Sequence, residues 1–180
     1  MLHYLAMFKQ RAYDVFGKYL QTLVERIKND YFASGLKATG FYGENVEWFL
    51  QDKGPRLIGR IEVPHYAQYM TFGREPTKKS EGGILYGIIR NWVDIKPGVP
   101  PPGWTADSFA YVVTQRIHRE GIQVPNPYNP GDVTTKAVDN FIESELQQFI
   151  DDVGVVAVNT IQSDLIPDIL AKFRAAQNST

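Results

Sequence analysis

Two pairs of carboxylates are the residues whose type and spacing best suit catalysis. Asp139 and Glu143 are four residues apart, as are Asp164 and Asp168, so each pair lies on one face of a helix. Such pairs can hold a divalent ion or act as general acid and base. Nothing else in the sequence converges on either pair, and an ordinary solvated helix face has the same spacing. We interpret both pairs as surface residues and keep a small hydrolase or metal-dependent enzyme as an alternative.

Other signatures of catalysis and metal binding are missing from the sequence. His3, His65 and His118 do not share a helical metal-ligand spacing, and the chain has no cysteine. No Gly-x-Ser-x-Gly elbow and no phosphate-binding glycine loop occurs. The sequence therefore predicts a protein that is not an enzyme, with no catalytic residue, no metal and no cofactor.

Length and charge limit the remaining classes. The chain has 180 residues, 43% of them hydrophobic, with 19 Lys and Arg against 20 Asp and Glu. A formal charge of -1 argues against a dedicated binder of nucleic acid or of an anionic membrane. No uninterrupted apolar run approaches the roughly 18–20 residues that span a bilayer. We therefore expect no membrane partner.

A basic stretch rich in aromatic residues supports a second function. Residues 53–79 carry Lys53, Arg56, Arg60, Arg74, Lys78 and Lys79, interleaved with Tyr66, Tyr69 and Phe72. Basic and aromatic residues together are typical of surfaces that bind single-stranded nucleic acid. Acidic residues within the same stretch weaken that interpretation, so a nucleic-acid-binding accessory protein is kept as the alternative. Residues 136–152 are acidic, and the basic and acidic parts can attract each other between copies of the chain. An ordinary solvated face is the favoured alternative for each individual charge.

The first half of the chain shows helix and hairpin patterns. Apolar residues at three- and four-residue spacing predict a helix over 3–31. Alternating residues within 41–64, around a turn at 52–55, predict an antiparallel β-hairpin. The aromatic segment 65–73 fits a helical turn or an irregular strand, and 84–94 fits a short helix. The prolines of 97–102 predict a stiff, extended arm.

The second half is predicted to be mostly helical. Thr105 is the expected N-cap of a helix over 106–120, and a second proline loop follows at 124–131. A helix starting at Asp132 or Thr134 is expected to stop at Gly154. Another is expected over 155–175, kinked or restarted at Pro167, with a strand at 155–158 as the alternative. Together these elements predict a single α+β domain over 1–175, helical from about 132, with a frayed tail at 176–180.

An aromatic, glycine and arginine pattern sets the middle of the chain apart. It runs through Tyr66-x-x-Tyr69-x-x-Phe72-Gly73-Arg74-x-Pro76, then Ile84, Ile88 and Trp92, then Phe109-Ala110-Tyr111-Val112-Val113-x-x-Arg116-Ile117-His118-Arg119-Glu120-Gly121-Ile122. In this order, after a long helix and a hairpin, it resembles the tail-completion and neck proteins of tailed bacteriophages, which join the head to the tail. The resemblance covers about residues 1–130 and fits less clearly from Asp132 on.

The resemblance implies a non-catalytic structural protein of the virion, assembled in the host cytoplasm. It implies an α+β protomer that forms a closed homo-oligomeric ring at the head–tail (portal–tail) junction, against adjoining portal or connector and tail proteins. DNA would pass through the lumen without sequence-specific binding. Identical copies in head-to-tail contact close into a ring when the rotation permits. The proline arms 97–102 and 125–130 are expected to stay extended and reach a neighbour.

Seven side chains are the interface candidates. Large aromatic rings fill a core or a subunit interface, and arginine presents a fork of donors to carboxylates. Ordinary core packing is the alternative for each ring. Gly73 is expected to permit a backbone angle that other residues avoid. The candidates are Tyr66, Tyr69, Phe72, Arg74, Trp92, Tyr111 and Arg116.

Overall fold

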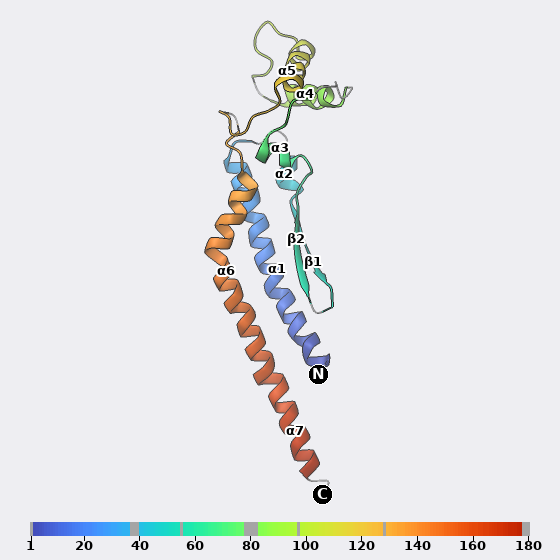
Figure 1. The fold of residues 1–180 in the computed structure, drawn as a ribbon, viewed down its shortest axis with the longest axis vertical. Helices are drawn as coiled ribbons and strands as arrows, with labels where there is room; N and C mark the ends of the chain where they lie inside the picture. Colours follow the sequence, from blue (N-terminus) through green and yellow to red (C-terminus); the bar gives the residue numbers. More distant parts are fainter. Residues whose placement is uncertain are drawn as a thin grey trace. The chain divides into compact units, whose positions relative to one another are not determined.

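The computed structural model describes residues 2–36, 40–54, 56–77, 83–96, 98–127 and 129–177, and shows an α+β protein with a long N-terminal helix (Figure 1). Its contacts divide the chain into two compact units, each built from segments far apart in sequence. Unit 1 comprises residues 1–25, 47–62 and 138–180, and unit 2 comprises 26–46 and 63–137. The single domain expected over 1–175 stays a prediction.

The N-terminal helix and the hairpin were predicted correctly. Helix α1 spans Leu2–Ala33, and the Ser34 amide closes its last turn on the Asp30 carbonyl at 2.9 Å. Strands β1 (Glu47–Asp52) and β2 (Leu57–Glu62) pair antiparallel, with Glu47 opposite Glu62 and Asp52 opposite Leu57. The sequence pattern did not indicate helix α2 (Phe41–Glu44), a single turn that follows Gly40 and places Tyr42 in the core.

Unit 1 is organised around the first 25 residues of α1, with the hairpin on one side and the C-terminal helices on the other (Figure 1). Phe16 and Tyr19 pack edge-on against Phe149, with ring centroids 4.7 and 5.2 Å apart. On the hairpin side, the Tyr13 hydroxyl donates to the Leu50 carbonyl at 3.3 Å. Burial of these rings contributes to the stability of unit 1, because each removes a large apolar area from water.

The C-terminal helices are longer than expected. Helix α6 spans Val133–Thr160 and passes through Gly154, so the predicted stop and the alternative strand at 155–158 are both wrong. A glycine inside a helix costs only about 1 kcal/mol. Contacts with α1 on both sides offset it: Tyr19 donates to Asp152 at 2.9 Å, and Arg11 donates to Thr160 at 3.2 Å.

Pro167 is accommodated by a widened turn. The π-helical turn η1 (Ile161–Leu165) ends where the Ile166 amide bonds to the Ile161 carbonyl, and α7 begins at Ile166 and runs to Gln177. Proline has no amide hydrogen and crowds the preceding turn, so a local change in helical pitch is the expected response. The kink or restart expected at Pro167 is thus a π-helical turn, after which the chain continues as α7. Residues 176 and 177 belong to α7, and the remainder of the expected frayed tail lies outside the described residues.

Unit 2 packs short helices around a core of tyrosines. Tyr42 is almost fully buried, stacks on Tyr31 with ring centroids 4.6 Å apart, and shares a 2.5 Å hydrogen bond with the Thr134 hydroxyl. Helix α3 (Ala67–Phe72) settles the open choice at 65–73 in favour of helix. Helices α4 (Ile84–Ile95) and α5 (Ala106–Glu120) pack together, and Thr105 caps α5 as predicted by accepting the Ser108 amide.

The two proline segments are not extended arms. In the first, the Trp104 amide bonds to the Pro101 carbonyl at 3.2 Å, and Gly98 and Gly103 take positive φ angles, so the chain turns. In the second, Asn126 and Asn129 form a backbone bridge, and the Asn129 amide group donates to the Met70 carbonyl at 3.0 Å. Glycine and asparagine chemistry therefore overrides the preference of proline for extended backbone. Pro97 and Tyr128 lie outside the described residues.

Candidate functional site

All seven predicted interface residues lie in unit 2, and the structure divides them by burial. Tyr66 and Trp92 are half-buried. The Tyr66 ring lies near Phe41 and Tyr42, and burial raises the pKa of its hydroxyl to about 12. Tyr66 thus contributes to the packing of the unit, which was the alternative stated for each ring.

Three predicted aromatic side chains are exposed instead. The exposed fractions are 44% for Tyr69, 79% for Phe72 and 58% for Tyr111. Burying a side chain of this size contributes roughly 1.5–3 kcal/mol, and that contribution is not realised by rings left in water. Exposed aromatic rings of this kind are the usual anchors of protein–protein contacts.

A two-way backbone bridge joins the two glycine-containing parts of the sequence pattern. The amide and carbonyl of Arg74 both bond to Ile122, each at 2.8 Å. Gly73 precedes the first residue and Gly121 the second, with φ angles of 80° and 75°. The positive angle predicted for Gly73 is confirmed. A Cβ atom on either glycine would lie only 2.1 or 2.2 Å from the carbonyl oxygen of Ile122 or Arg74, so both positions require glycine.

This bridge fixes the exposed residues around it. Phe72 and Arg74 line a shallow groove of about 630 Å³ together with Glu120 and Val124. Phe72 ends α3 directly before Gly73, and its side chain points to solvent. The bridge therefore holds an aromatic ring and a guanidinium beside the C-terminal end of α5.

Arg116 is already paired within its own helix. Its Nε donates to Glu120 at 2.7 Å, and Arg119 donates to the other Glu120 oxygen at 2.6 Å. The hydrogen bond from Arg116 lowers the pKa of the Glu120 carboxyl most, and the hydrogen bond from Arg119 lowers it further. Two guanidiniums share one carboxylate, so this exposed cluster keeps a surplus positive charge. The expected contact of Arg116 with a carboxylate of another copy stays a prediction.

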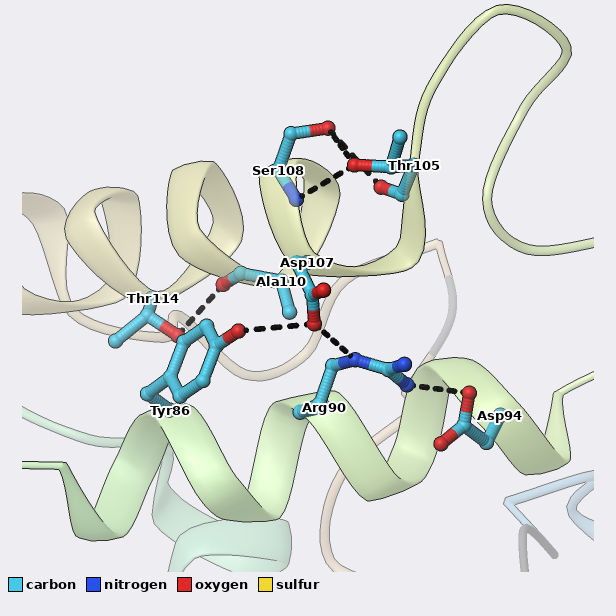
Figure 2. A network of polar contacts seen from close by, with 8 residues as sticks. All are labelled: Tyr86, Arg90, Asp94, Thr105, Asp107, Ser108, Ala110 and Thr114. Atoms are coloured by element: carbon cyan, nitrogen blue, oxygen red, sulfur yellow. Dashed lines mark hydrogen bonds and ion pairs between the residues drawn. The ribbon is translucent and has the colours of Figure 1, made fainter.

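Sequence patterns did not indicate the polar network that joins α4 to α5 (Figure 2). Arg90 on α4 lies between Asp94 on its own helix and Asp107 on α5, and its Nε donates to Asp107 at 2.6 Å. Tyr86 donates to the same Asp107 oxygen at 3.2 Å. Arg90 and then Tyr86 lower the pKa of Asp107, because both favour the ionised carboxylate. The network orients α5, which carries Tyr111 and Arg116.

The Asp107→Asn variant is expected to be less stable than the wild type near neutral pH. The folded-state pKa of Asp107 lies below the unfolded value of about 3.9, so its contribution is present above that value. The contribution is lost as the pH falls through the folded-state pKa. Urea unfolding from neutral to acid pH checks this: the two stability curves should converge at the acid end. A constant gap at every pH would contradict it.

The two carboxylate pairs on the C-terminal helices lie in different surroundings. Asp164 is held by Arg11 at 2.9 Å and Asp168 by Lys172 at 2.6 Å, whereas Asp139 and Glu143 point to solvent from α6. Within the described ranges, no group of three His, Asp or Glu side chains is placed to hold a metal ion.

The C-terminal helices leave much apolar surface in contact with solvent. By length and composition alone, Val133–Ala175 is able to cross a membrane, and only 6% of its most apolar window is buried. One helix of this kind is weak evidence, since helices of soluble proteins pass the same criterion. The expectation of no membrane partner stays a prediction.

Comparison with known proteins gives no matching family model, no matching curated protein and no matching solved structure.

Proposed function

We propose that this chain is a structural protein of a tailed-phage virion that forms a ring at the head–tail junction, in the connector, neck or tail-terminator layer. The observation that carries the proposal is the exposure of Tyr69, Phe72 and Tyr111 on a rigidly bridged unit. Such rings contribute to stability only when a second protein surface covers them. The particular place in the virion rests on the resemblance of the sequence pattern around these residues to neck and tail-completion proteins.

The geometry of unit 2 suits an assembly of many copies. The candidate residues lie on helices and on a bridged segment, where their positions are fixed before contact. Pre-ordered surfaces lose little conformational entropy on binding. Copies related by a rotation bury the same surfaces repeatedly and close into a ring, with adjoining portal or connector and tail proteins above and below. The DNA then passes through the lumen without sequence-specific binding.

Deletion of the gene from the phage genome that encodes the chain tests the proposal. The expected result is the accumulation of filled heads and separate tails, with joining restored by the wild-type gene supplied in trans. Electron microscopy of the particles gives the measurement. Complete infectious virions made without the chain would overturn the proposal.

The nucleic-acid-binding alternative is tested by a separate measurement. Of the basic residues in the stretch 53–79, Lys53, Arg56 and Arg60 belong to unit 1 and Arg74 to unit 2, whereas Lys78 and Lys79 lie outside the described residues. Arg60 is paired with Glu62 at 2.6 Å. A DNA-binding accessory protein would bind single strands tightly, with an affinity that falls steeply as salt increases. The proposed ring protein binds short DNA weakly. Fluorescence anisotropy over a salt series separates the two functions.

A further inference from the structure

One face of α6 combines acidic and apolar side chains that are exposed in the described chain. Asp139, Ile142, Glu143, Leu146 and Ile150 follow a three- and four-residue spacing, and all five are exposed. We call these five residues the acidic α6 face. No ion pair in the described part of the chain involves either carboxylate. The three aliphatic side chains are each about half exposed, which is unusual for a stripe of this regularity.

A face of opposite charge lies on α5 in unit 2. Tyr111, Val112, Arg116 and Arg119 occupy one side of that helix and are all exposed. We call these four residues the basic α5 face. The Arg116 and Arg119 side chains are each 74% exposed, and they share the single carboxylate of Glu120. The face therefore presents an aromatic ring, an aliphatic group and a surplus positive charge.

The net charges of the two units have the same signs as the acidic α6 face and the basic α5 face. The segments of unit 1 carry 8 Lys and Arg against 12 Asp and Glu, and those of unit 2 carry 11 against 8. Unit 1 is thus formally -4 and unit 2 is +3, although the whole chain is only -1. Opposite charges on the two units of a nearly neutral chain favour contacts between unit 1 of one copy and unit 2 of another.

We propose that the acidic α6 face of one copy binds the basic α5 face of the next copy. In this contact Ile142, Leu146 and Ile150 cover Tyr111 and Val112, while Asp139 and Glu143 meet the surplus charge of Arg116 and Arg119. The inference rests on the proposed ring function and names the surfaces that build the ring. Because the two faces are different, the contact is head to tail, which is the type that closes into rings.

The contact also gives the Asp139 and Glu143 pair a role. Carboxylates at the rim of an apolar contact mainly increase the association rate and fix the partner's orientation. Asp139 and Glu143 are four residues apart on α6, and Arg116 and Arg119 are three residues apart on α5. Both spacings place the two side chains next to each other on one helix face, so the two pairs can face each other. The three aliphatic residues of the acidic α6 face supply the burial that holds the complex together.

Two variants, each altering one face, test the proposal. Leu146→Lys places a positive charge in the acidic α6 face, and Val112→Glu places a negative charge in the basic α5 face. Each variant alone is expected to weaken the contact between copies at least about 10-fold, because each buries a like charge against its partner. The measurement is the mass distribution by mass photometry and sedimentation over a concentration series.

Mixing the two variants is the decisive step. Each retains the face that the other has lost, so one intact contact forms in the mixture. The expected species contain both variants: a dimer of two 20.4 kDa chains, and larger alternating oligomers where the introduced lysine and the introduced glutamate attract each other across the second contact. A contact between identical faces would not be restored by mixing, so the absence of any species containing both variants would overturn the proposal.

Matched controls show whether charge alone disturbs the assembly. Val155→Lys changes an exposed valine nine residues along α6 from Leu146, which is the opposite side of the helix. Ile88→Glu changes an exposed isoleucine on α4 of unit 2. Both are expected to assemble like the wild type. Should Leu146→Lys lower the unfolding temperature, the double variant Asp139→Lys with Glu143→Lys tests the same face through exposed residues.

The outcomes separate this inference from the proposed function. If the wild type forms rings and the face variants form them equally well, the assigned surfaces are wrong and the ring function stands. If the wild type stays monomeric even with its neighbouring virion proteins, the proposed function fails. If the wild type instead binds lipid vesicles and Leu146→Lys abolishes that binding, the α6 face contacts a membrane and the inference is overturned.

Discussion

Replacement of Gly121 by alanine will lower the free energy of unfolding by about 2–5 kcal/mol. The residue has a φ of 75° and a ψ of -163°, a backbone region that only glycine occupies readily. The left-handed conformation alone costs a side-chain-bearing residue about 1–2 kcal/mol. The new Cβ would also lie 2.2 Å from the Arg74 carbonyl oxygen, so the two Arg74–Ile122 hydrogen bonds would have to break. Each such bond contributes about 0.5–1.5 kcal/mol. Urea unfolding followed by circular dichroism measures the change.

The matched control for this variant is Gly83→Ala. Gly83 also has a φ of 75°, but no atom lies within 4 Å of the position of its added Cβ. Gly83→Ala therefore tests the effect of a positive φ without a collision. We expect it to lower the free energy of unfolding by less than half as much as Gly121→Ala. Equal costs at Gly121 and Gly83 would show that the bridge adds nothing to the stability of unit 2. Gly73→Ala meets the Ile122 carbonyl in the same way and should resemble Gly121→Ala.

Replacement of Ile27 by alanine is expected to cost about 2–5 kcal/mol, as for other large-to-small changes in protein cores. Ile27 is fully buried in unit 2, whose core also holds Tyr31 and Tyr42. The variant loses both the apolar burial and the packing contacts around the space that remains. Thermal and urea unfolding of the purified chain measure the loss.

Two further variants give the control series. Ile27→Val removes one methylene group and should cost about 0.5–1.5 kcal/mol. Leu5→Ala alters a residue of the same helix that is half exposed, so its cost should be smaller than that of Ile27→Ala. A similar loss for Leu5 and Ile27 would contradict the burial assigned to these positions.

Local patterns in the sequence indicated most of the elements. Spacing of apolar residues was enough for α1 and α5, and Thr105 was identified as the cap of α5 because capping depends on a single side chain next to the helix. Alternation and a turn signal were likewise enough for the hairpin, since neighbouring strands need no distant partner.

The errors fall where a distant contact outweighs a local preference. Gly154 is a helix breaker by propensity, but Tyr19 and Arg11 of α1 hold α6 on both sides of it. The proline arms were expected to be extended, but Asn129 ties the second to Met70 of α3. Tyr19, Arg11 and Met70 lie far in sequence from the segments that they contact, so no local sequence pattern predicts these contacts.

The candidate surface was predictable only in part. Residue type identified Tyr69, Phe72 and Tyr111 as possible anchors, and the structure places all three at the surface. Residue type could not distinguish them from Tyr66, which packs beside Tyr42. The bond from Arg90 to Asp107 was missed because each residue looks like an ordinary surface charge until the two helices meet.

The mass of the assembled chain tests the central claim most directly. Native mass spectrometry and electron microscopy of the purified wild-type protein, over a range of concentrations, measure it. A head-to-tail contact that closes on itself gives one discrete multiple of 20.4 kDa and ring-shaped particles. A chain that stays at 20.4 kDa at every concentration, and also in the presence of the neighbouring virion proteins, would contradict the account.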